Sequence, residues 1–318
     1  MGFLGMLSMP LRRGKPLARP LPPLLREGDT VALIAPASPV APERLDVAIA
    51  NLNGLGLRVR EGKYLRSAQG YLAGTDAQRA ADLHDAFADP EVRGVWCARG
   101  GYGCTRLLDI LDYGLIKRNP KPFVGFSDVT ALHAAIVGRC AMATFHAQVA
   151  AAPWVEPVRE CLRGALFAGG PMPFTLRADG AFLPPNPTQE VRGLLAGGNL
   201  ALMAAMTGTP HGPSYRDKIV FIEDVGERPY RIDRMLTQLL QGSDLRKAAA
   251  IVLGRFAECE PRAGEFSFSL AECLADRLGN LGMPVVGYFP FGHVAENFPL
   301  PCGQMARLQG PDLHLFTT

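Results

Sequence analysis

Apolar runs alternate with amphipathic stretches along the first half of the chain. Residues 31–35 of "DTVALIAPAS" form a near-continuous apolar run, and similar runs occur in "VRGVWC" and "KPFVGF". Runs without polar alternation are typical of strands covered on both faces, as in a parallel sheet. Helical spacing recurs in "PERLDVAIANLNGLG", "GTDAQRAADLHDAFADP" and "TRLLDILDYGLIKRNP", and Thr75 is suited to cap the second of these helices. Strands alternating with helices in units of roughly 30 residues indicate βαβ units.

The pattern changes at residues 169–188, where "GGPMPFTLRADGAFLPPNP" is rich in proline and glycine. We interpret this segment as a linker. Further apolar strands are expected in "KIVFIED", "AAIVLGRF" and "MPVVGYFPF", with helices between them. The sequence therefore predicts an α/β fold. A parallel-sheet domain of flavodoxin or Rossmann type would span residues 26–168, and a smaller α/β domain would span residues 189–318. Residues 1–25, which are rich in proline, would form a loose extension.

Composition and charge agree with an ordinary globular protein. The chain has 318 residues, of which 48% are hydrophobic and 20% charged, and its formal net charge is +3. This length favours two domains. The basic runs "PLRRGK" and "IKRNPK" are short and lack interleaved aromatic residues, so we expect no nucleic-acid partner. No stretch approaches the roughly 18 apolar residues of a membrane span, and no long apolar segment marks a signal peptide. We therefore expect no membrane partner.

Seven cysteines, at positions 97, 104, 140, 161, 259, 273 and 302, include no C-x-x-C pair. An odd number without paired spacing fits a reducing compartment, so we expect a cytoplasmic protein whose thiols are mostly small core residues. Cys97 and Cys104 lack the His or Cys neighbours that would complete a metal site. We therefore expect no metal.

The stretch "FVGFSDVTALHAAI" (residues 123–136) joins an apolar run to a helical pattern through a Ser-Asp pair. Ser127 at this corner has two interpretations. It can be an N-cap, whose oxygen accepts from a free backbone N–H of the next turn. It can instead be a nucleophile presented on a tight strand-to-helix turn. Val129 stands where the G-x-S-x-G motif has its second glycine, which disfavours an ordinary α/β-hydrolase.

A glycine-rich loop, "ARGGYG" (residues 98–103), follows the third expected strand. Open α/β sheets bind ligands at such strand ends. The loop is neither a G-x-G-x-x-G dinucleotide fingerprint nor a phosphate loop, because no third glycine and no Gly-Lys-Ser/Thr follow. Gly100 and Gly101 can bring backbone N–H groups close to a developing negative charge. An ordinary turn is an equally good interpretation.

Two further candidate site residues follow expected strands in the second half of the chain. Glu223 ends the apolar strand of "IVFIED", where a carboxylate needs a partner. That partner can be His293, in the loop after "YFPFG", or one of the nearby arginines 228, 231 and 234. An imidazole in a loop suits proton transfer near neutral pH. His146, in "ATFHAQ", also follows a short strand and could line a cleft.

Ser127, Glu223 and His293 form an ordered set, each at the carboxyl end of its own expected strand. The order Ser, acid, His is one of several that catalytic triads adopt. In that arrangement His293 would remove the Ser127 proton and later donate it to the leaving amine, while Glu223 would orient the imidazole. The N–H of Asp128 and one from residues 100–101 could form an oxyanion hole.

Six motifs occur in an order that resembles a known family. They are "GYLAGTDAQRAADLHDAFADP", "ARGGYG", "FVGFSDVTALH", "GLLAGGNLALM", "FIEDVGERPYRIDRMLTQL" and "GHVAENFPLPCG". This is the order found in LD-carboxypeptidases, the muramoyltetrapeptide carboxypeptidases, which have microcin C immunity peptidases as relatives. The resemblance runs from about Gly28 to about Leu308. It implies that Ser127 is the nucleophile, with Glu223 and His293 completing the triad.

The resemblance also implies the oxyanion donors, the Asp128 amide and a glycine amide of "ARGG". It further implies a cleft between the two domains, no metal or organic cofactor, and a homodimer. The substrate would be a cytoplasmic peptidoglycan fragment, cut between a diamino acid and its terminal D-alanine. Arg231 is a candidate for holding the terminal carboxylate, because its fork suits carboxylates, although it can equally pair with Asp224 or Glu227.

One departure concerns substrate choice. Many family members read T-x-H-G-P where this chain reads "TFHAQ", with Ala147 and Gln148 replacing Gly and Pro. A peptidase acting on aminoacyl-nucleotide or acyl-sulfamate conjugates is therefore an alternative. A non-catalytic binder of peptidoglycan peptides is another, which the presence of all three triad residues disfavours. A nicotinamide enzyme lacks support because the glycine fingerprint is missing.

Overall fold

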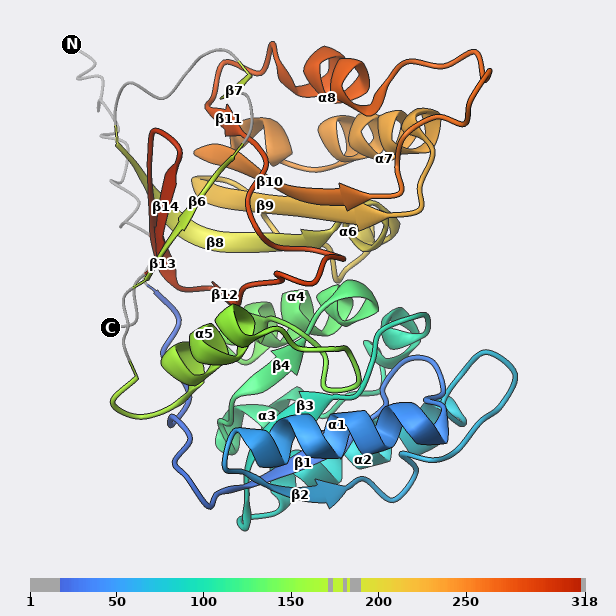
Figure 1. Cartoon of the computed structure of the whole chain (residues 1–318), viewed down its shortest axis with the longest axis vertical. Helices are drawn as coiled ribbons and strands as arrows, with labels where there is room; N and C mark the ends of the chain where they lie inside the picture. Colours follow the sequence, from blue (N-terminus) through green and yellow to red (C-terminus); the bar gives the residue numbers. More distant parts are fainter. Residues whose placement is uncertain (1–17, 171–173, 180–181, 184–189, 316–318) are drawn as a thin grey trace, which may run out of the picture.

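The computed structural model describes residues 18–170, 174–179, 182–183 and 190–315. Two α/β domains lie one above the other, each built on its own sheet (Figure 1). The N-terminal sheet has six strands in the order β12-β5-β4-β3-β1-β2, and the C-terminal sheet has eight in the order β6-β14-β13-β8-β9-β10-β11-β7. The predicted α/β class is confirmed.

The N-terminal sheet contains β1 (Thr30–Ile34), β2 (Arg58–Glu61), β3 (Val92–Cys97), β4 (Phe123–Gly125), β5 (Thr144–His146) and β12 (Leu300–Cys302). Its helices are α1 (Pro42–Gly54), α2 (Asp76–Ala88), α3 (Tyr113–Arg118), α4 (Thr130–Arg139) and α5 (Glu156–Leu166), with short 3-10 turns at Cys104–Leu107 and Ser127–Val129. The strands from β1 to β5 are parallel, as their apolar runs predicted, and only β12 is antiparallel to its neighbour. Parallel order collects the carboxyl ends of these strands at one edge.

The C-terminal sheet contains β6 (Phe174–Arg177), β7 (Phe182–Leu183), β8 (Val191–Asn199), β9 (Lys218–Val225), β10 (Ala250–Ala257), β11 (Val285–Val286), β13 (Met305–Gln309) and β14 (Asp312–Leu315). Its helices are α6 (Leu200–Met206), α7 (Pro229–Gly242) and α8 (Leu270–Leu278), with a 3-10 turn at Leu245–Lys247. The central strands β8 to β11 pair in parallel, and the outer strands pair antiparallel.

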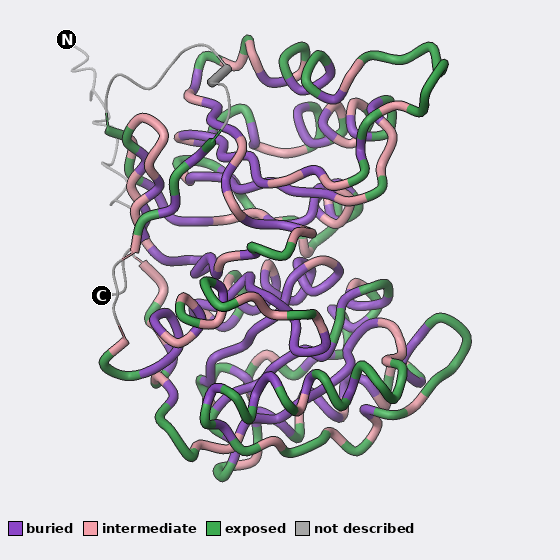
Figure 2. The backbone as a smooth tube through the Cα atoms, in the orientation of Figure 1, coloured by how far each residue is buried: buried purple, intermediate pink, exposed green. Residues whose placement is uncertain are grey.

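Buried residues line the sheets of both domains and continue through the zone between them (Figure 2). In the N-terminal domain two apolar clusters form, one around Ile34, Leu83 and Phe123, the other including Leu33 and Trp96. Because a sheet with buried side chains on both faces needs helices on both sides, this packing explains the unbroken apolar runs of its strands. Among the described residues, no helix is long and apolar enough to cross a membrane.

Helix α2 forms as its sequence predicts. The Thr75 hydroxyl accepts from the Gln78 N–H at 3.2 Å, and the Gln78 side chain accepts from the Thr75 N–H at 2.9 Å. This reciprocal capping box satisfies two of the N–H groups that a helix start leaves open. Leu83 and Phe87 are fully buried on the core face.

The helix expected over "TRLLDILDYGLIKRNP" is wrong as a single element. The chain forms the 3-10 turn Cys104–Leu107 and then the short helix α3. Asp112 begins α3, because its side chain accepts from the Leu115 N–H at 2.8 Å while its own N–H donates to His84 Nε2 at 2.9 Å. A capping aspartate in the middle of an apolar pattern therefore divides the segment.

The expected linker and extension also differ from the structure. Strands β6 and β7 lie within residues 169–188, and β6 pairs with β14 at the sheet edge. The described part of the extension is packed: Leu25 is 1% exposed, and the Arg19 N–H donates to the Gly303 carbonyl at 2.9 Å. Short edge strands tolerate nearby proline, which hid them in the composition. Residues 1–17, 171–173, 180–181 and 184–189 lie outside the described residues.

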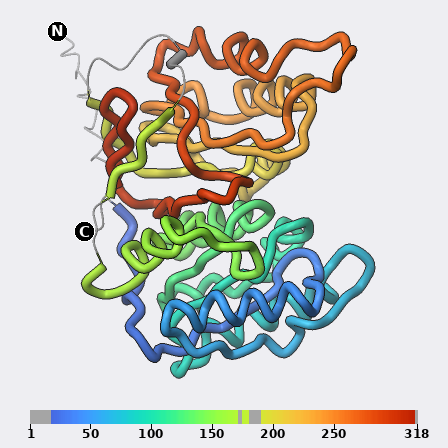
Figure 3. Tube along the Cα trace, in the orientation of Figure 1, coloured from blue at the N-terminus to red at the C-terminus, as the bar shows by residue number. Residues whose placement is uncertain are grey.

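Strand β12 crosses the expected domain boundary. It belongs to the C-terminal part of the sequence, yet it pairs antiparallel with β5, with Leu300 opposite His146 and Cys302 opposite Thr144. Figure 3 shows this red segment running along the green part of the N-terminal domain. The C-terminal segment therefore supplies the edge strand of the N-terminal sheet.

Candidate active site

Ser127 follows β4 at the carboxyl edge of the N-terminal sheet. Its backbone has φ of 65°, a left-handed conformation that is uncommon for a residue with a Cβ and costs roughly 1–3 kcal/mol. Of residues 121–133, Ser127 alone is not buried. Its side chain does not cap either following turn. The structure thus excludes the capping role and places the hydroxyl on a sharp, strained corner facing outward.

Gly100 makes this corner possible. A Cβ on Gly100 would lie 2.7 Å from the Ser127 Cβ and 2.9 Å from its Oγ, which is closer than side chains pack. Gly101 has φ of 117°, and a Cβ there would meet the Ser38 hydroxyl. The backbone of the "ARGGYG" loop therefore approaches the Ser127 hydroxyl as only glycine allows.

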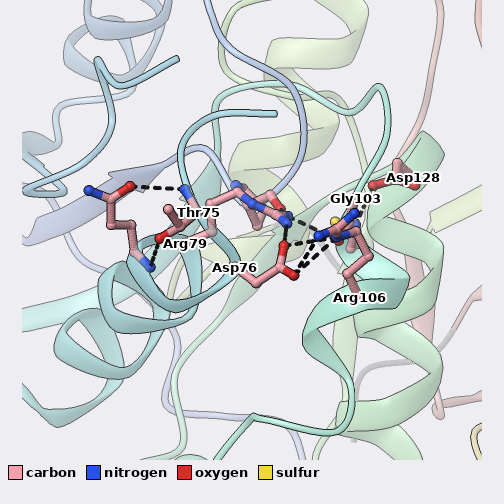
Figure 4. A network of polar contacts seen from close by, with 9 residues as sticks. Thr75, Asp76, Arg79, Gly103, Arg106 and Asp128 are labelled. Carbon is pink, nitrogen blue, oxygen red and sulfur yellow. Dashed lines mark hydrogen bonds and ion pairs between the residues drawn. The ribbon is translucent and has the colours of Figure 1, made fainter. Parts of the chain in front are cut away.

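The C-terminal end of the loop is anchored by a polar network, shown in Figure 4. The buried Arg79 donates to the Gly103 carbonyl at 2.9 Å and pairs with Asp76. The Cys104 N–H donates to Asp128 Oδ2 at 2.8 Å. Since Asp128 follows Ser127 directly, its side chain ties the serine corner to the glycine loop, while its backbone N–H stands at the start of the 3-10 turn.

Ser38 supports the other side of the same loop. Its N–H donates to the Gly100 carbonyl at 3.4 Å, and its hydroxyl accepts from the Tyr102 N–H at 3.1 Å. These contacts fix the peptide planes on both sides of Gly101. Fixed N–H groups beside a nucleophile are what an oxyanion site requires.

Glu223 and His293 come together in the C-terminal domain. Glu223 Oε2 lies 2.7 Å from His293 Nδ1. Glu223 is fully buried near the end of β9, whereas the His293 side chain is 19% exposed. Gly292 has φ of 116°, and a Cβ there would stand 3.1 Å from Glu223 Oε2. This glycine thus lets the loop bring the imidazole against the carboxylate.

Asp224 points away from that pair, because successive strand residues face opposite sides. Its oxygens accept from Asn199 Nδ2 at 2.9 Å, from the Ala201 N–H at 3.0 Å and from the Val225 N–H at 2.8 Å. Burial raises its pKa to about 6, and the neighbouring Glu223 acts in the same direction. Asp224 therefore holds the start of α6 against β9, which leaves Glu223 as the acid that serves His293.

Ser127 and His293 line one cleft of about 640 Å³. Gly100, Gly101 and Phe126 line it from the N-terminal domain, and Val225 from the C-terminal domain. The rings of Phe126 and His293 stand 4.8 Å apart between centroids. No hydrogen bond joins Ser127 Oγ to His293 in the structure as described, although both residues line the same cleft. Catalytic hydrogen bonds often tighten only once substrate is bound.

Two other expected site residues lie elsewhere. His146 is fully buried, with its ring 5.8 Å from Phe126 and 5.1 Å from Phe221, and burial lowers its pKa well below the usual range. It does not line the cleft. Arg231 lies on α7, with its side chain 54% exposed and 3.5 Å from Glu227. Its pairing with Glu227 was one of the two interpretations left open.

The departure at "TFHAQ" falls behind the cleft wall. Ala147 and Gln148 are buried, and the Gln148 carbonyl accepts from the Trp96 indole N–H at 3.0 Å. The residues that reach the cleft come slightly later, at Val149, Ala151 and Ala152. The replaced pair therefore acts on the cleft only through the position of this following loop.

Sequence reasoning missed two arginines that line the cleft, Arg44 on α1 and Arg99 beside the glycine loop. Arg99 stood inside the motif "ARGGYG", which was a usable signal. No sequence signal pointed to Arg44, since a charged residue in the first turn of a helix usually faces solvent.

Among the described residues, the thiols and the acidic groups form neither a second nucleophilic site nor a metal site. All seven cysteines are free, and six are buried. Burial raises the pKa of the Cys97 and Cys104 thiols far above the usual range, with the Asp128 charge adding to the effect. Buried neutral thiols are poor nucleophiles. In the described ranges, no three His, Cys, Asp or Glu side chains gather as metal ligands would.

Comparison with known proteins places this geometry in a family. A family model described as the LD-carboxypeptidase N-terminal domain matches residues 31–147, and one described as the LD-carboxypeptidase C-terminal domain matches residues 192–308. The probable murein peptide carboxypeptidase of Bacillus subtilis is 40% identical over 291 residues, covering 90% of this chain and 91% of that protein. The murein tetrapeptide carboxypeptidase of Pseudomonas aeruginosa is 37% identical over 295 residues, covering 88% and 93%.

Solved structures agree with these matches. The muramoyltetrapeptide carboxypeptidase from Oxalobacter formigenes has a TM-score of 0.79 and 30% identity, covering 90% of this chain and 97% of that one. An MccF-like protein from Bacillus anthracis has a TM-score of 0.81 and 25% identity, covering 94% and 99%. Since sequence and structure matches span both domains, the chain belongs to the LD-carboxypeptidase family.

Proposed function

We propose that the chain is a serine carboxypeptidase that releases terminal D-alanine from muropeptide tetrapeptides by cleaving an L,D-peptide bond. The observation that carries the proposal is the cleft shared by Ser127 and His293, with Glu223 Oε2 2.7 Å behind the imidazole. Named relatives that are murein peptide and murein tetrapeptide carboxypeptidases, at 40% and 37% identity, support the substrate class.

The first half of the reaction forms an acyl-enzyme. His293 accepts the Ser127 hydroxyl proton, and Oγ attacks the carbonyl carbon between the diamino acid and D-alanine. Glu223 keeps the imidazole oriented and stabilises its cation. The intermediate collapses as the C–N bond breaks, and the proton on His293 passes to the departing amine of D-alanine. The second half uses water, whose proton goes to His293 while its oxygen attacks the ester, which frees the shortened peptide and restores Ser127.

The negative charge on the carbonyl oxygen needs donors in both halves. We assign the N–H of Asp128 and the N–H of Gly101 to this role, with Gly100 kept free of a side chain so that the loop can approach. Removing one such donor typically costs 10²–10³ in kcat. The contact between Ser127 and His293, which line the same cleft, would tighten when substrate is bound.

The remaining expectations belong to the same proposal. Seven free thiols support a reducing, cytoplasmic location, where the substrate would be a recycled peptidoglycan fragment. The family resemblance supports a homodimer, which light scattering at micromolar concentration tests directly.

Mass spectrometry of a mixed muropeptide digest tests the activity. We expect tetrapeptides to lose one alanine and become tripeptides, while Ser127→Ala leaves them intact and keeps the circular-dichroism spectrum of the native protein. The same two proteins are then given an aminoacyl-sulfamate nucleoside. Turnover of that conjugate alone would assign the microcin-type activity instead, and full activity of Ser127→Ala would contradict the serine mechanism.

A further inference from the structure

The cleft beside Ser127 carries positive charge only. Arg44 and Arg99 line it, and no aspartate or glutamate does so among the described residues. Neither arginine forms an ion pair within the described ranges, whereas Arg231 stands beside Glu227. Two guanidinium groups without a carboxylate partner, facing the same cavity, form a site for an anionic ligand.

Arg99 is held in a fixed orientation. Its Nε donates to the Gly100 carbonyl at 3.2 Å, and its Nη1 donates to the Pro39 carbonyl at 3.1 Å. These bonds leave Nη2 unengaged in the structure as described. Because the guanidinium group is already positioned, the Arg99 side chain loses less conformational entropy when a ligand binds there.

Arg99 also lies at the correct place relative to the bond that breaks. Its Nη2 is 3.6 Å from the point where a Cβ on Gly101 would stand, so the cation is beside the glycine assigned as an oxyanion donor. In a carboxypeptidase substrate the free carboxylate belongs to the residue just past the scissile bond, and neighbouring Cα atoms are only about 3.8 Å apart. A carboxylate bound by Arg99 would therefore leave the preceding carbonyl near Ser127.

Arg44 reaches the same cavity from α1, across the Pro39 to Ala41 segment. It stands in the first turn of that helix and is exposed. We propose that Arg44 and Arg99 together bind the C-terminal carboxylate of the substrate and so restrict the enzyme to the last peptide bond. The inference rests on the proposed carboxypeptidase activity. It assigns carboxylate binding to Arg44 and Arg99 in place of Arg231.

A matched pair of substrates tests this subsite. The peptides are L-Ala-D-Glu-diaminopimelate-D-Ala with a free C-terminal acid and the same peptide with a C-terminal amide. Wild-type protein should prefer the acid, and Arg99→Gln or Arg44→Gln should lower kcat/KM for the acid about 10- to 100-fold while leaving the amide nearly unchanged. Arg99→Lys should restore part of the preference, mainly through KM. Arg93→Gln, at the opposite end of β3, is the control.

The outcomes separate this inference from the proposed function. An acid-to-amide ratio that is the same in wild type, Arg99→Gln and Arg44→Gln overturns the subsite while D-alanine release stands. Absence of both D-alanine release from the acid and D-alanine amide release from the amide overturns the function. In that case calorimetry with the Ser127→Ala protein measures the affinity for each peptide. Tighter binding of the acid than of the amide, with the difference lost when Arg99→Gln is added, supports the subsite. Equal affinity for the two peptides refutes it.

Discussion

Ser127 combines a left-handed backbone with an accessible side chain, and a helix cap needs neither. The residues around it are buried, and Gly100 is pressed against its hydroxyl. The strain at this one residue has to be compensated by the surrounding packing, because nothing in the local sequence favours φ of 65° for serine. Such a cost is typical of positions that are kept for chemistry.

Removing the side chain should reveal that cost. Ser127→Gly and Ser127→Ala both lack the hydroxyl, but only glycine adopts positive φ freely. We expect the glycine variant to be more stable than the alanine variant by about 1 kcal/mol, with a Tm higher by about 2–4 °C. Thermal unfolding followed by circular dichroism measures the difference, and identical Tm values would show that the corner is unstrained.

The residues of the site differ in how well the amino-acid sequence predicts them. Ser127, Glu223 and His293 each follow an apolar run, so their strand-end positions and their family motifs could be identified without a structure. The contact of Glu223 with His293 depends on a loop whose path is set by Gly292, which no pattern predicts. Arg44 enters the cleft from a helix that is distant in sequence from every other lining residue.

At the level of elements, α2 does more than cover the sheet. Its first turn supplies Arg79, which donates to the Gly103 carbonyl of the glycine loop, and Asp76, which pairs with Arg79 (Figure 4). Its middle turn buries Asp82, whose two oxygens both accept from the Tyr64 N–H at 3.0–3.1 Å. One capped helix therefore supports the glycine loop at one position and carries a buried acid at another.

Asp82 should make stability depend on pH. Burial raises its pKa to about 6, and the charge of Asp85 contributes. Between about pH 4 and pH 6 the folded state keeps a proton that the unfolded state has released, so the free energy of unfolding falls as pH rises. We expect Asp82→Asn, which cannot ionise and keeps one acceptor for Tyr64, to be more stable than wild type by about 1–3 kcal/mol at pH 7.5.

Urea unfolding at several pH values checks this expectation. The advantage of Asp82→Asn should shrink towards zero near pH 4, where wild-type Asp82 is protonated in the folded state. A difference that stays constant from pH 4 to pH 8 would contradict the titration and point to packing instead.

The sequence pattern also predicted some helices and strands incorrectly. The run from residue 105 to 120 has helical spacing throughout, yet Asp112 begins a new helix because its N–H has a partner in His84. The short strands β6 and β7 lie in proline- and glycine-rich sequence, where pairing with distant strands decides the structure. Local periodicity contains no information on either long-range contact.

In the whole molecule, the proposed catalytic groups are divided between the domains. Ser127 and the glycine loop belong to one sheet, Glu223 and His293 to the other, and the cleft lies between them. The strand β12 returns from the C-terminal part to the N-terminal sheet and pairs with β5. The relative placement of the two halves is therefore fixed by a strand as well as by side-chain packing.

The N-terminal domain should depend on that strand. A protein of residues 18–168 alone exposes the edge of β5, and we expect it to self-associate. The same protein with residues 298–304 attached through a flexible linker should be monomeric and more stable, because the edge is paired again. Size-exclusion chromatography with light scattering compares the two. A monomeric, equally stable product without the added strand would argue against this dependence.

The returning strand also limits how members of this family can exchange parts. The two family models cover residues 31–147 and 192–308, which suggests a hybrid enzyme made by joining two parents near residue 190. Such a chimera would combine β5 from one parent with β12 from the other. Residues 300–302 would have to be taken from the parent that supplies residues 144–146, so the natural unit of recombination is discontinuous along the gene.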